Sequence, residues 1–411
     1  MVKFAVLGCG VVGSGVVELF EKNKALIEKR CGQSLEMGYI LDLRDFPDRP
    51  YGNKVVKSLD VILADPEVKV VAECMGGTEP AFTFVKSCLE AGKSVATSNK
   101  ELVAAKGDIL LQTAKEHNVN FFFEASVGGA IPIIRPLHKC LAANDFTAIA
   151  GILNGTTNFI LNKMIKENMD FSTALALAQE KGYAEKDPTA DVEGHDACRK
   201  ICILSSLAFG KHVYPESVYT KGIREVELKD VELASELGYT IKLIARVQRL
   251  ENGKILPTVM PMVVEEDNLL SQVNGVYNAV MVRGDGISKA MFYGRGAGKF
   301  PTASAVLGDM IEEVQLDHTI PSQTWENVNS TDFIEDFAAF TAKRYVRTTG
   351  AQAADLTAVF GQLTGTTLNT ADGETVFITD TAMNAADVSA AEEKLAAKGI
   401  KVLAQYPVLV S

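Results

Sequence analysis

The sequence predicts an α/β protein with a doubly wound parallel sheet first, a mixed α/β domain next and a small α+β domain last. Three observations lead to this prediction. The chain has 411 residues, too many for one ordinary core. Short apolar runs alternate regularly with helical patterns up to about residue 125. Beyond that point the regular alternation stops, and the apolar runs are separated by longer helical or loop stretches.

The first 125 or so residues carry five apolar runs that we expect to be strands. These runs cover 4–7, 37–43, 68–74, 94–97 and 119–123, and helical patterns between them include 16–29, 80–91 and 108–116. Repeated strand–helix–strand units predict a parallel sheet with right-handed crossovers. Ligands of such sheets bind beyond the carboxyl ends of the strands, so the turns at those ends are candidate binding segments.

The middle and the tail follow different patterns. Strand-like runs at 147–153 and 241–250 predict a second sheet, and a glycine-rich loop at 293–298 precedes a helical run at 302–313. The polar stretch 315–329 is interpreted as a linker. The tail then predicts a small separate domain, with strands at 342–347, 374–379 and 401–406 and helices at 353–360 and 385–398.

Composition narrows the functional class. Hydrophobic residues make up 47% and charged residues 23%, and the formal net charge is −11. Without a block of lysines and arginines, this balance argues against nucleic acid or an anionic membrane as main partners. The seven cysteines are scattered and form no CxxC pair, which favours a reducing compartment over disulfides or zinc. No leader or spanning segment is visible, so we expect a cytoplasmic protein.

A glycine loop at the first strand–helix junction predicts dinucleotide binding. In Gly8-Cys-Gly10-Val-Val-Gly13, Gly8 allows a tight turn, Gly10 lets the backbone approach a pyrophosphate, and Gly13 lets helix and strand pack closely. The free amides of the helix start then point at the phosphates. The second strand ends near Asp42, Arg44 and Asp45. An acid there suits the ribose of NAD and an arginine suits the 2′-phosphate of NADP, so both remain possible, with a lean to NADP through Arg44.

Polar residues later in the chain supply candidate chemistry. Lys100 follows the apolar strand 94–97, where a nicotinamide is expected, although a surface lysine is an equal alternative. Asp196 and Lys200 share one face of a helix expected from about 195 to 207, whose continuation is strongly apolar. A charged pair there needs a polar pocket, and the nearby carboxylates suit a cationic group such as an amine. The run 154–158 either contacts ligand or caps the helix that follows it.

Taken together, these segments resemble homoserine dehydrogenases. The matching segments occur in family order over about residues 1 to 320: the glycine loop, 98–100, 124–132, 151–158, 182–188, 191–200, 294–298 and 301–304. The resemblance implies a Rossmann domain at 1–130 plus about 296–320, and a substrate and dimerisation domain at 131–295. It also implies a degenerate ACT-like domain at 330–411. Because the tail lacks the usual Asp-x-Pro-Gly loop, we do not expect feedback inhibition by threonine.

The resemblance also implies residue roles. The family interconverts L-aspartate 4-semialdehyde and L-homoserine with NAD or NADP, as a homodimer or homotetramer. The reacting group would meet Lys200, with Lys100 as second choice, and Asp196 would orient Lys200. Substrate contacts would come from Glu185, Asp191, Asn154, Gly155 and Thr156. Cofactor contacts would come from Gly8, Gly10, Val11, Val12, Gly13, Arg44, Ser98, Lys100 and Gly298. A monovalent cation such as Na⁺ would lie on Glu124, Val127, Gly129 and Ile131, largely on their backbone carbonyls.

Two other functions fit parts of the pattern. A covalent semialdehyde dehydrogenase needs a positioned thiolate, and only Cys198 falls among the acidic residues, where it is expected to face the helix core. A dinucleotide-binding sensor without catalysis does not need the two lysines, Lys100 and Lys200. It also does not need the three carboxylates, Glu185, Asp191 and Asp196. The residues therefore favour a dehydrogenase.

Overall fold

The structure, a computed structural model, describes residues 1–316, 325–328 and 330–409. The chain forms two compact units. The first contains Met1–Ile149, Arg199–Pro215 and Val280–Ser330, and the second contains Ala150–Cys198, Glu216–Ala279 and Thr331–Ser411. The domain boundaries expected from the sequence stay a prediction. No helix of the described residues is long and apolar enough to cross a membrane.

The first unit contains the predicted doubly wound sheet. Its six parallel strands have the order β3-β2-β1-β4-β5-β6, in which the direction of winding reverses between β1 and β4. The strands are β1 (Val2–Leu7), β2 (Leu35–Leu41), β3 (Val55–Val56), β4 (Val68–Glu73), β5 (Ser94–Thr97) and β6 (Phe121–Phe122). The five strands expected from the sequence are confirmed, with ends that differ by up to two residues.

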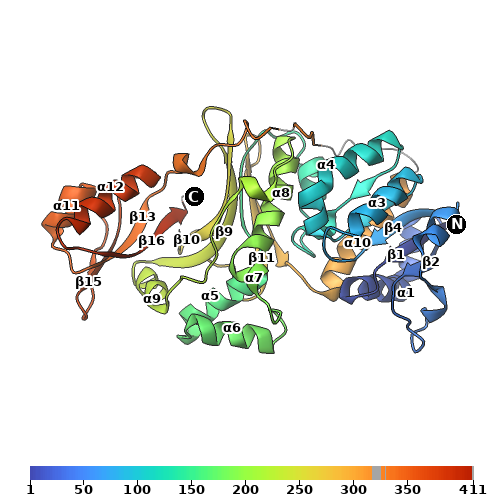
Figure 1. Cartoon of the computed structure of the whole chain (residues 1–411), viewed down its shortest axis with the longest axis horizontal. Coiled ribbons are helices and arrows are strands. Elements are labelled where there is room, and N and C mark those ends of the chain that lie inside the picture. Colours follow the sequence, from blue (N-terminus) through green and yellow to red (C-terminus); the bar gives the residue numbers. More distant parts are fainter. Residues whose placement is uncertain (317–324, 329, 410–411) are drawn as a thin grey trace. The chain divides into compact units, whose positions relative to one another are not determined.

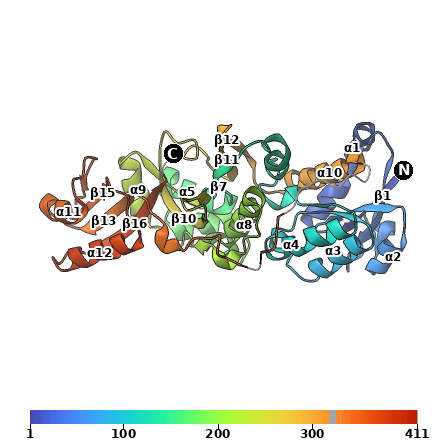
Figure 2. The same cartoon turned by 90° about the horizontal axis from the view of Figure 1, so that it is seen from above.

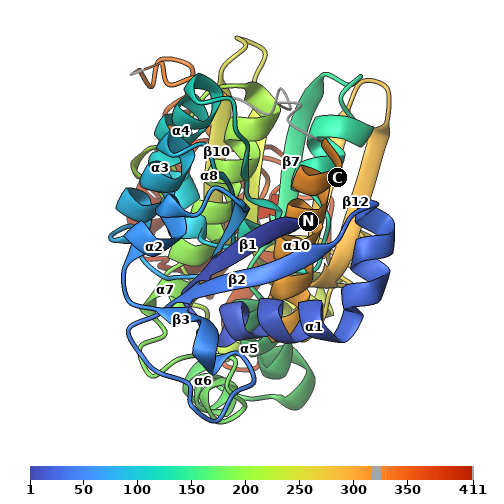
Figure 3. The same ribbon diagram turned by 90° about the vertical axis from the view of Figure 1, so that its right-hand side faces the viewer.

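Helices cover both faces of this sheet (Figure 3). On one face lie α3 (Ala81–Glu90) and α4 (Lys100–Glu116), and on the other lie α1 (Val11–Cys31) and α10 (Lys299–Leu316). The expected helix at 108–116 was placed too late, because α4 begins at Lys100. Asn99 caps α4 by accepting a hydrogen bond from the Leu102 amide at 3.1 Å. This cap fixes the helix start directly after β5.

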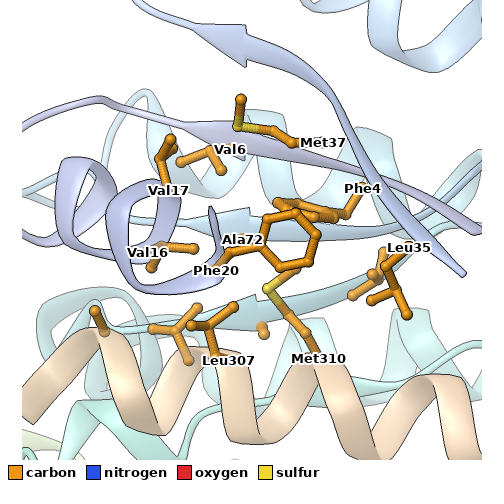
Figure 4. Close-up of a cluster of buried hydrophobic side chains, with 14 of the residues drawn as sticks. Phe4, Val6, Val16, Val17, Phe20, Leu35, Met37, Ala72, Leu307 and Met310 are labelled. Atoms are coloured by element: carbon orange, nitrogen blue, oxygen red, sulfur yellow. The ribbon is translucent and has the colours of Figure 1, made fainter. Parts of the chain in front are cut away.

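The core between α1, α10 and the sheet joins segments that are far apart in sequence. Phe4 and Phe20 meet edge to face with ring centroids 4.8 Å apart, and Leu307 and Met310 of α10 pack into the same cluster (Figure 4). All four side chains are at most 5% exposed. Burial of this much apolar surface is the main force that holds α10 against the first domain.

The second unit contains the strands β9-β10-β16-β13-β15-β14 of a larger, ten-stranded mixed sheet, and β8 (Tyr219–Thr220) pairs with β10. Its longest strands, β9 (Tyr239–Arg249) and β10 (Ile255–Glu265), form an antiparallel hairpin in which Ile255 pairs with Arg249. Helices α5 (Gly155–Glu167), α6 (Phe171–Glu180) and α9 (Leu228–Glu236) belong to this unit. Strands β7 (Phe146–Ile152) and β11 (Tyr277–Gly284) and helix α8 (His195–Phe209) each include residues of both units. Strand β11 and helix α8 are labelled in Figure 1.

The tail forms a βαββαβ arrangement with both helices on one face of its sheet (Figure 2). Its elements are β13 (Arg344–Thr349), α11 (Ala353–Phe360), β14 (Leu368–Asn369), β15 (Glu374–Ile378), α12 (Ala385–Ala396) and β16 (Val402–Leu409). The three strands and two helices expected from the sequence are confirmed, and the short β14 is additional. This topology is the split βαβ arrangement, and its last strand continues the sheet through the pairing of Val408 with Val263 of β10.

A buried ion pair also joins the tail to α9. Arg347 donates from Nε to Asp230 at 2.7 Å, and the hydroxyls of Tyr345 and Tyr406 lie 3.2 and 3.3 Å from the same carboxylate. Burial raises the pKa of Asp230, so the guanidinium partner is needed to keep this carboxyl ionised. The tail is therefore attached to the second unit by polar contacts as well as by strand pairing.

Candidate active site

The glycine loop forms a tight junction between β1 and α1. Gly8 has φ +84°, a conformation that favours glycine, and a Cβ on Gly13 would lie 1.9 Å from the Gly8 carbonyl oxygen. A Cβ on Gly10, by contrast, would meet no atom within 4 Å. Gly10 is also the N-cap of α1, and it offers no side chain to the first amides of that helix. The junction therefore keeps its helix amides open toward free space, as a phosphate site requires.

The turn after β2 carries a carboxylate and an arginine, and a lysine that follows β3 binds its backbone. Asp42 accepts from the Cys9 amide of the glycine loop at 2.8 Å. Arg44 donates to both carboxylate oxygens of Asp42, at 3.0 and 2.9 Å. These bonds from Arg44 hold the pKa of Asp42 well below its usual range. Lys57, which the sequence reasoning missed, donates to the carbonyls of 42, 43 and 44 and pairs with Asp45 at 2.7 Å.

The two candidate lysines lie on segments that are joined by an ion pair. Lys100 is the first residue of α4, and Lys200 is a buried residue of α8. Glu101 and Arg199, the sequence neighbours of these lysines, form an ion pair of 2.5 Å. Because each partner is adjacent to one lysine, the pair brings the two lysine-bearing segments side by side.

Asn154 gathers the predicted substrate residues of the second unit. It caps α5 by accepting from the Thr157 amide at 2.8 Å. Its side-chain amide donates to Asp191 at 2.6 Å and to Asp196 at 2.8 Å. The structure shows that Asn154 caps the helix and bridges both carboxylates, and its contact with a ligand stays a prediction.

The other predicted substrate residues are Gly155, Thr156 and Glu185, and they differ in their contacts with the rest of the chain. Thr156 donates its hydroxyl to the Tyr183 carbonyl at 2.8 Å. A Cβ on Gly155 would lie 2.7 Å from the Val276 carbonyl oxygen, so this position needs glycine. Glu185 is exposed, and its backbone carbonyl accepts from Gln179 at 3.0 Å. The described hydrogen bonds therefore unite Asn154, Asp191 and Asp196, whereas Glu185 lies on the surface of the loop.

The segment predicted to bind a cation, residues 124–131, forms a turn that hydrogen bonds hold in place. The Glu124 carboxylate accepts from the backbone amides of Ile133, Ile134 and Arg135, at 2.6, 2.9 and 2.7 Å. Gly128 and Gly129 both have positive φ, +75° and +55°. The Ala130 amide donates to the Arg295 carbonyl at 3.1 Å. Because the Glu124 side chain is occupied by amides, backbone carbonyls are the groups of this turn that could hold a cation.

The metal-ligating and thiol side chains of the described residues form no metal cluster and no disulfide. In the described part of the chain, no group of three or more His, Cys, Asp or Glu side chains could hold a metal ion. All seven cysteines lie in that part and none is disulfide-bonded. Cys198 and Cys202 are buried, as expected for residues of a helix core. A covalent thiolate mechanism is therefore disfavoured.

The predicted linker contains a buried aromatic contact that the sequence reasoning missed. Residues 317–324 and 329 lie outside the described residues, but Trp325 is 4% exposed and donates its indole N–H to Nδ1 of His212 at 2.8 Å. Its ring lies edge-on to Phe123, with centroids 5.3 Å apart. A single tryptophan in a polar stretch was the available signal, because tryptophan is seldom left fully in solvent.

Comparison with known proteins gives a consistent result. Residues 8–124 match the family model described as the NAD binding domain of homoserine dehydrogenase, and residues 132–311 match the model described as homoserine dehydrogenase. The chain is 41% identical over 320 residues to a homoserine dehydrogenase of Lactococcus lactis, which covers 76% of this chain and 74% of the relative. It is 43% identical over 326 residues to that of Synechocystis, with coverages of 77% and 74%.

Solved structures extend the similarity over the tail. A homoserine dehydrogenase from Thiobacillus denitrificans superposes with a TM-score of 0.90 at 33% identity, covering 99% of this chain and 98% of the other. A hyperthermophilic archaeal homoserine dehydrogenase in complex with NADPH has a TM-score of 0.65 at 29% identity, covering 76% of this chain and 97% of the other.

Proposed function

Because the chain belongs to the homoserine dehydrogenase family, we propose that the lysines and carboxylates described above divide the work of its reaction. The activity is an NAD(P)-dependent oxidation and reduction at a CH–OH group, which interconverts L-aspartate 4-semialdehyde and L-homoserine in threonine and methionine biosynthesis. When bound, the nicotinamide supplies or accepts the hydride. The protein supplies position, charge and a proton.

The dinucleotide lies along the glycine loop in this proposal. The amides of Val11, Val12 and Gly13 would face the pyrophosphate over the open space at Gly10, and Gly8 and Gly13 would keep the turn tight. Ser98, Lys100 and Gly298 would complete the nicotinamide end. Arg44, whose side chain is 61% exposed, and Lys57 beside it support a preference for the 2′-phosphate of NADP.

Lys200 is the proposed acid and base at the substrate oxygen, with Lys100 as the alternative. The observation that carries this proposal is the ion pair between Glu101 and Arg199, which places the two lysine-bearing segments together. An ammonium group there stabilises the charge that develops on the carbonyl oxygen and donates the proton. Asp196, one helical turn before Lys200 on α8, would orient it.

The substrate amine is assigned to the carboxylates around Asn154. Asp191 and Asp196 present anionic oxygens that Asn154 holds in a fixed relation, and Gly155 and Thr156 form the turn beside them. Glu185, an exposed carboxylate six residues before Asp191, is assigned to the same amine. Fixing the amine would orient the reacting carbon relative to the hydride donor.

Three further assignments accompany this mechanism. A monovalent cation such as Na⁺ would bind the backbone carbonyls of Glu124, Val127, Gly129 and Ile131, in the turn where Gly128 and Gly129 have positive φ. The protein would act as a homodimer or homotetramer. Its location would be the cytoplasm, in keeping with its seven cysteines, which form no disulfide in the described part of the chain.

The first experiment follows absorbance of the nicotinamide band with purified protein and homoserine, offering NAD and NADP separately. Reduction faster with NADP than with NAD supports the Arg44 assignment, and the reverse order contradicts it. Lys200→Ala should lower turnover at least ~100-fold while leaving cofactor affinity near normal, the usual scale for loss of an acid–base group. Unchanged turnover in a folded Lys200→Ala protein would remove Lys200 from the mechanism.

A further inference from the structure

Glu73 is a buried carboxyl group that none of the assigned roles uses. It is the last residue of β4 and is 0% exposed. In the sheet register it pairs with Leu7 of β1 on one side and with Thr97 of β5 on the other. Glu73 therefore lies at the carboxyl edge of the sheet, at the reversal of strand order where such folds bind their ligands.

The hydrogen bonds of Glu73 reach two separate turns. Glu73 accepts a hydrogen bond from the Met75 amide at 2.6 Å through one carboxylate oxygen. Through the other oxygen it accepts from the hydroxyl of Thr97. Its backbone carbonyl accepts from the Ser98 amide at 3.1 Å. The turn after β4 and the turn after β5 are thus both anchored to Glu73.

The contacts continue from Thr97 to the start of α4. The Thr97 hydroxyl oxygen accepts from the Asn99 amide at 2.9 Å. The Asn99 side chain donates to the Gly77 carbonyl at 2.7 Å and caps α4 at Leu102. The chain of bonds closes a ring between the two turns and ends at the helix that begins with Lys100.

The same carboxylate also reaches the glycine loop through Met75. A Cβ on Gly8 would lie 2.9 Å from the Cγ atom of Met75 and 3.2 Å from the Cys74 carbonyl oxygen. Met75 therefore lies directly against the first glycine of the loop. Because the Met75 amide is bound by Glu73, the position of this contact depends on Glu73.

We propose that Glu73 is a positioning residue, which holds the turns 74–78 and 97–100 against the glycine loop in the arrangement that receives the nicotinamide half of the cofactor. The inference rests on the proposed placement of the nicotinamide beside Ser98 and Lys100. It requires the carboxylate form, because only this form offers an acceptor on each oxygen. Protonation makes one oxygen a hydroxyl donor, and an amide replaces that oxygen with an NH2 donor. In either case the Thr97 hydroxyl must accept instead of donate, and both contacts lose the strength that a charged acceptor gives them.

The environment makes this requirement sensitive to pH. Burial raises the pKa of Glu73 to about 7. Burial also raises the pKa of the neighbouring Cys74 thiol well above its usual range, so this thiol stays neutral. The sheet neighbours Leu7 and Thr97 carry no ionisable group. As pH falls through about 7, Glu73 gains a proton and the anchoring of the turns weakens.

The test uses the full chain with three variants. Glu73→Gln keeps the shape and removes the second acceptor, and Thr97→Val removes the hydroxyl that links Glu73 to Asn99. Glu313→Gln is the matched control, because Glu313 binds Ser94 and Asn120 at 2.7 and 2.6 Å, at the opposite end of the same strand β5. NADPH affinity is measured by fluorescence titration, and KM for the cofactor by absorbance, between about pH 6 and pH 9.

For the wild type and the Glu313→Gln control, KM for the cofactor should rise as pH falls through about 7. Glu73→Gln should weaken NADPH binding roughly tenfold at high pH, the scale of one hydrogen bond to a charged group, and should lose the pH dependence. Thr97→Val should weaken binding similarly. A folded Glu73→Gln protein with wild-type affinity and pH profile overturns the inference, and so does an equal defect in Glu313→Gln. Because NADPH affinity is read without turnover, these results are independent of the acid–base role proposed for Lys200.

Discussion

Two junctions between a strand and a helix, β1 to α1 and β7 to α5, have the same local plan and opposite electrostatic character. At the first, the helix is capped by Gly10, which leaves the helix amides open. At the second, Asn154 caps the helix with its own oxygen and turns its amide group toward Asp191 and Asp196. The first junction therefore suits an anion, and the second gathers negative charge that suits a cation.

The comparison teaches that one residue at the cap position can decide which charge a helix start will bind. A helix N-terminus by itself favours anions, because its free amides carry partial positive charge. At α5 the cap satisfies one of those amides, and two carboxylates lie beside it. The two junctions thus carry the charges that the proposed dinucleotide contact and the proposed amine contact require.

The largest expected effect comes from the first junction, where two glycines should respond differently to alanine. Gly13→Ala should destabilise the protein by several kcal/mol, because its Cβ would lie 1.9 Å from the Gly8 carbonyl oxygen. Gly10→Ala should leave the melting temperature near that of the wild type, since no atom lies within 4 Å of its Cβ. It should still weaken cofactor binding roughly 10- to 100-fold, because the methyl group fills the space left for the pyrophosphate.

Calorimetry and cofactor titration separate these outcomes. If Gly10→Ala binds cofactor like the wild type, the open space at this position does not receive phosphate, and the contrast between the junctions fails.

At the second junction, Asn154→Ala should lower kcat/KM for homoserine more than tenfold and leave NADPH affinity unchanged. Without the Asn154 amide, the repulsion between the carboxylates of Asp191 and Asp196 is no longer offset by this shared hydrogen-bond donor. The proposed amine site therefore becomes disordered. Asn384→Ala is the matched control, because Asn384 caps α12 in the same unit with no assigned ligand. Both variants should lose about 1 kcal/mol of stability as caps. Equal kinetics in the two variants would reduce Asn154 to a cap.

Arg44→Ala should reduce the preference for NADP over NAD by roughly tenfold, the scale of one charge-assisted bond to a phosphate. The ratio of kcat/KM values for the two cofactors is the measurement. Arg30→Ala, at an exposed arginine in the last turn of α1, serves as the control. An unchanged ratio would assign the choice of cofactor to Lys57 or Asp42.

The smallest effect concerns Lys242, a buried residue of β9 that contacts α5 near the second junction. Its ammonium donates to Asn158 of α5 at 3.1 Å and to the Val273 carbonyl at 2.7 Å, and burial lowers its pKa to about 8. In the unfolded chain this lysine keeps its proton to higher pH. Between about pH 8 and pH 10 the unfolded state therefore binds more protons, and the free energy of unfolding gains a positive slope with pH.

Lys242→Met should lack this contribution to the slope. Denaturant unfolding at several pH values, compared with the exposed-lysine variant Lys181→Met, provides the measurement. Identical slopes in wild type and Lys242→Met would show that this lysine titrates normally in the folded protein.

Local patterns predicted the glycine loop, the parallel strands and the tail elements, because each depends on residues close in sequence. The start of α4 was missed although Asn99 is a recognisable cap, since the helical pattern was followed only from residue 108. Glu73 was not predicted because a carboxylate at a strand end usually faces solvent, and its burial depends on Thr97, 24 residues later. The pair of Asp230 and Arg347 spans 117 residues, and no local signal connects them.

The packing of α10 on α1 has a consequence for how the protein is made. The core around Phe4 and Phe20 is completed by Leu307 and Met310, so about three quarters of the chain must leave the ribosome before this core can close. Until then the growing chain carries an apolar face without its cover, and such faces are bound by chaperones or associate with one another. A fragment ending near residue 145 should consequently be a poor nucleotide-binding module, even though it contains every strand of the first sheet.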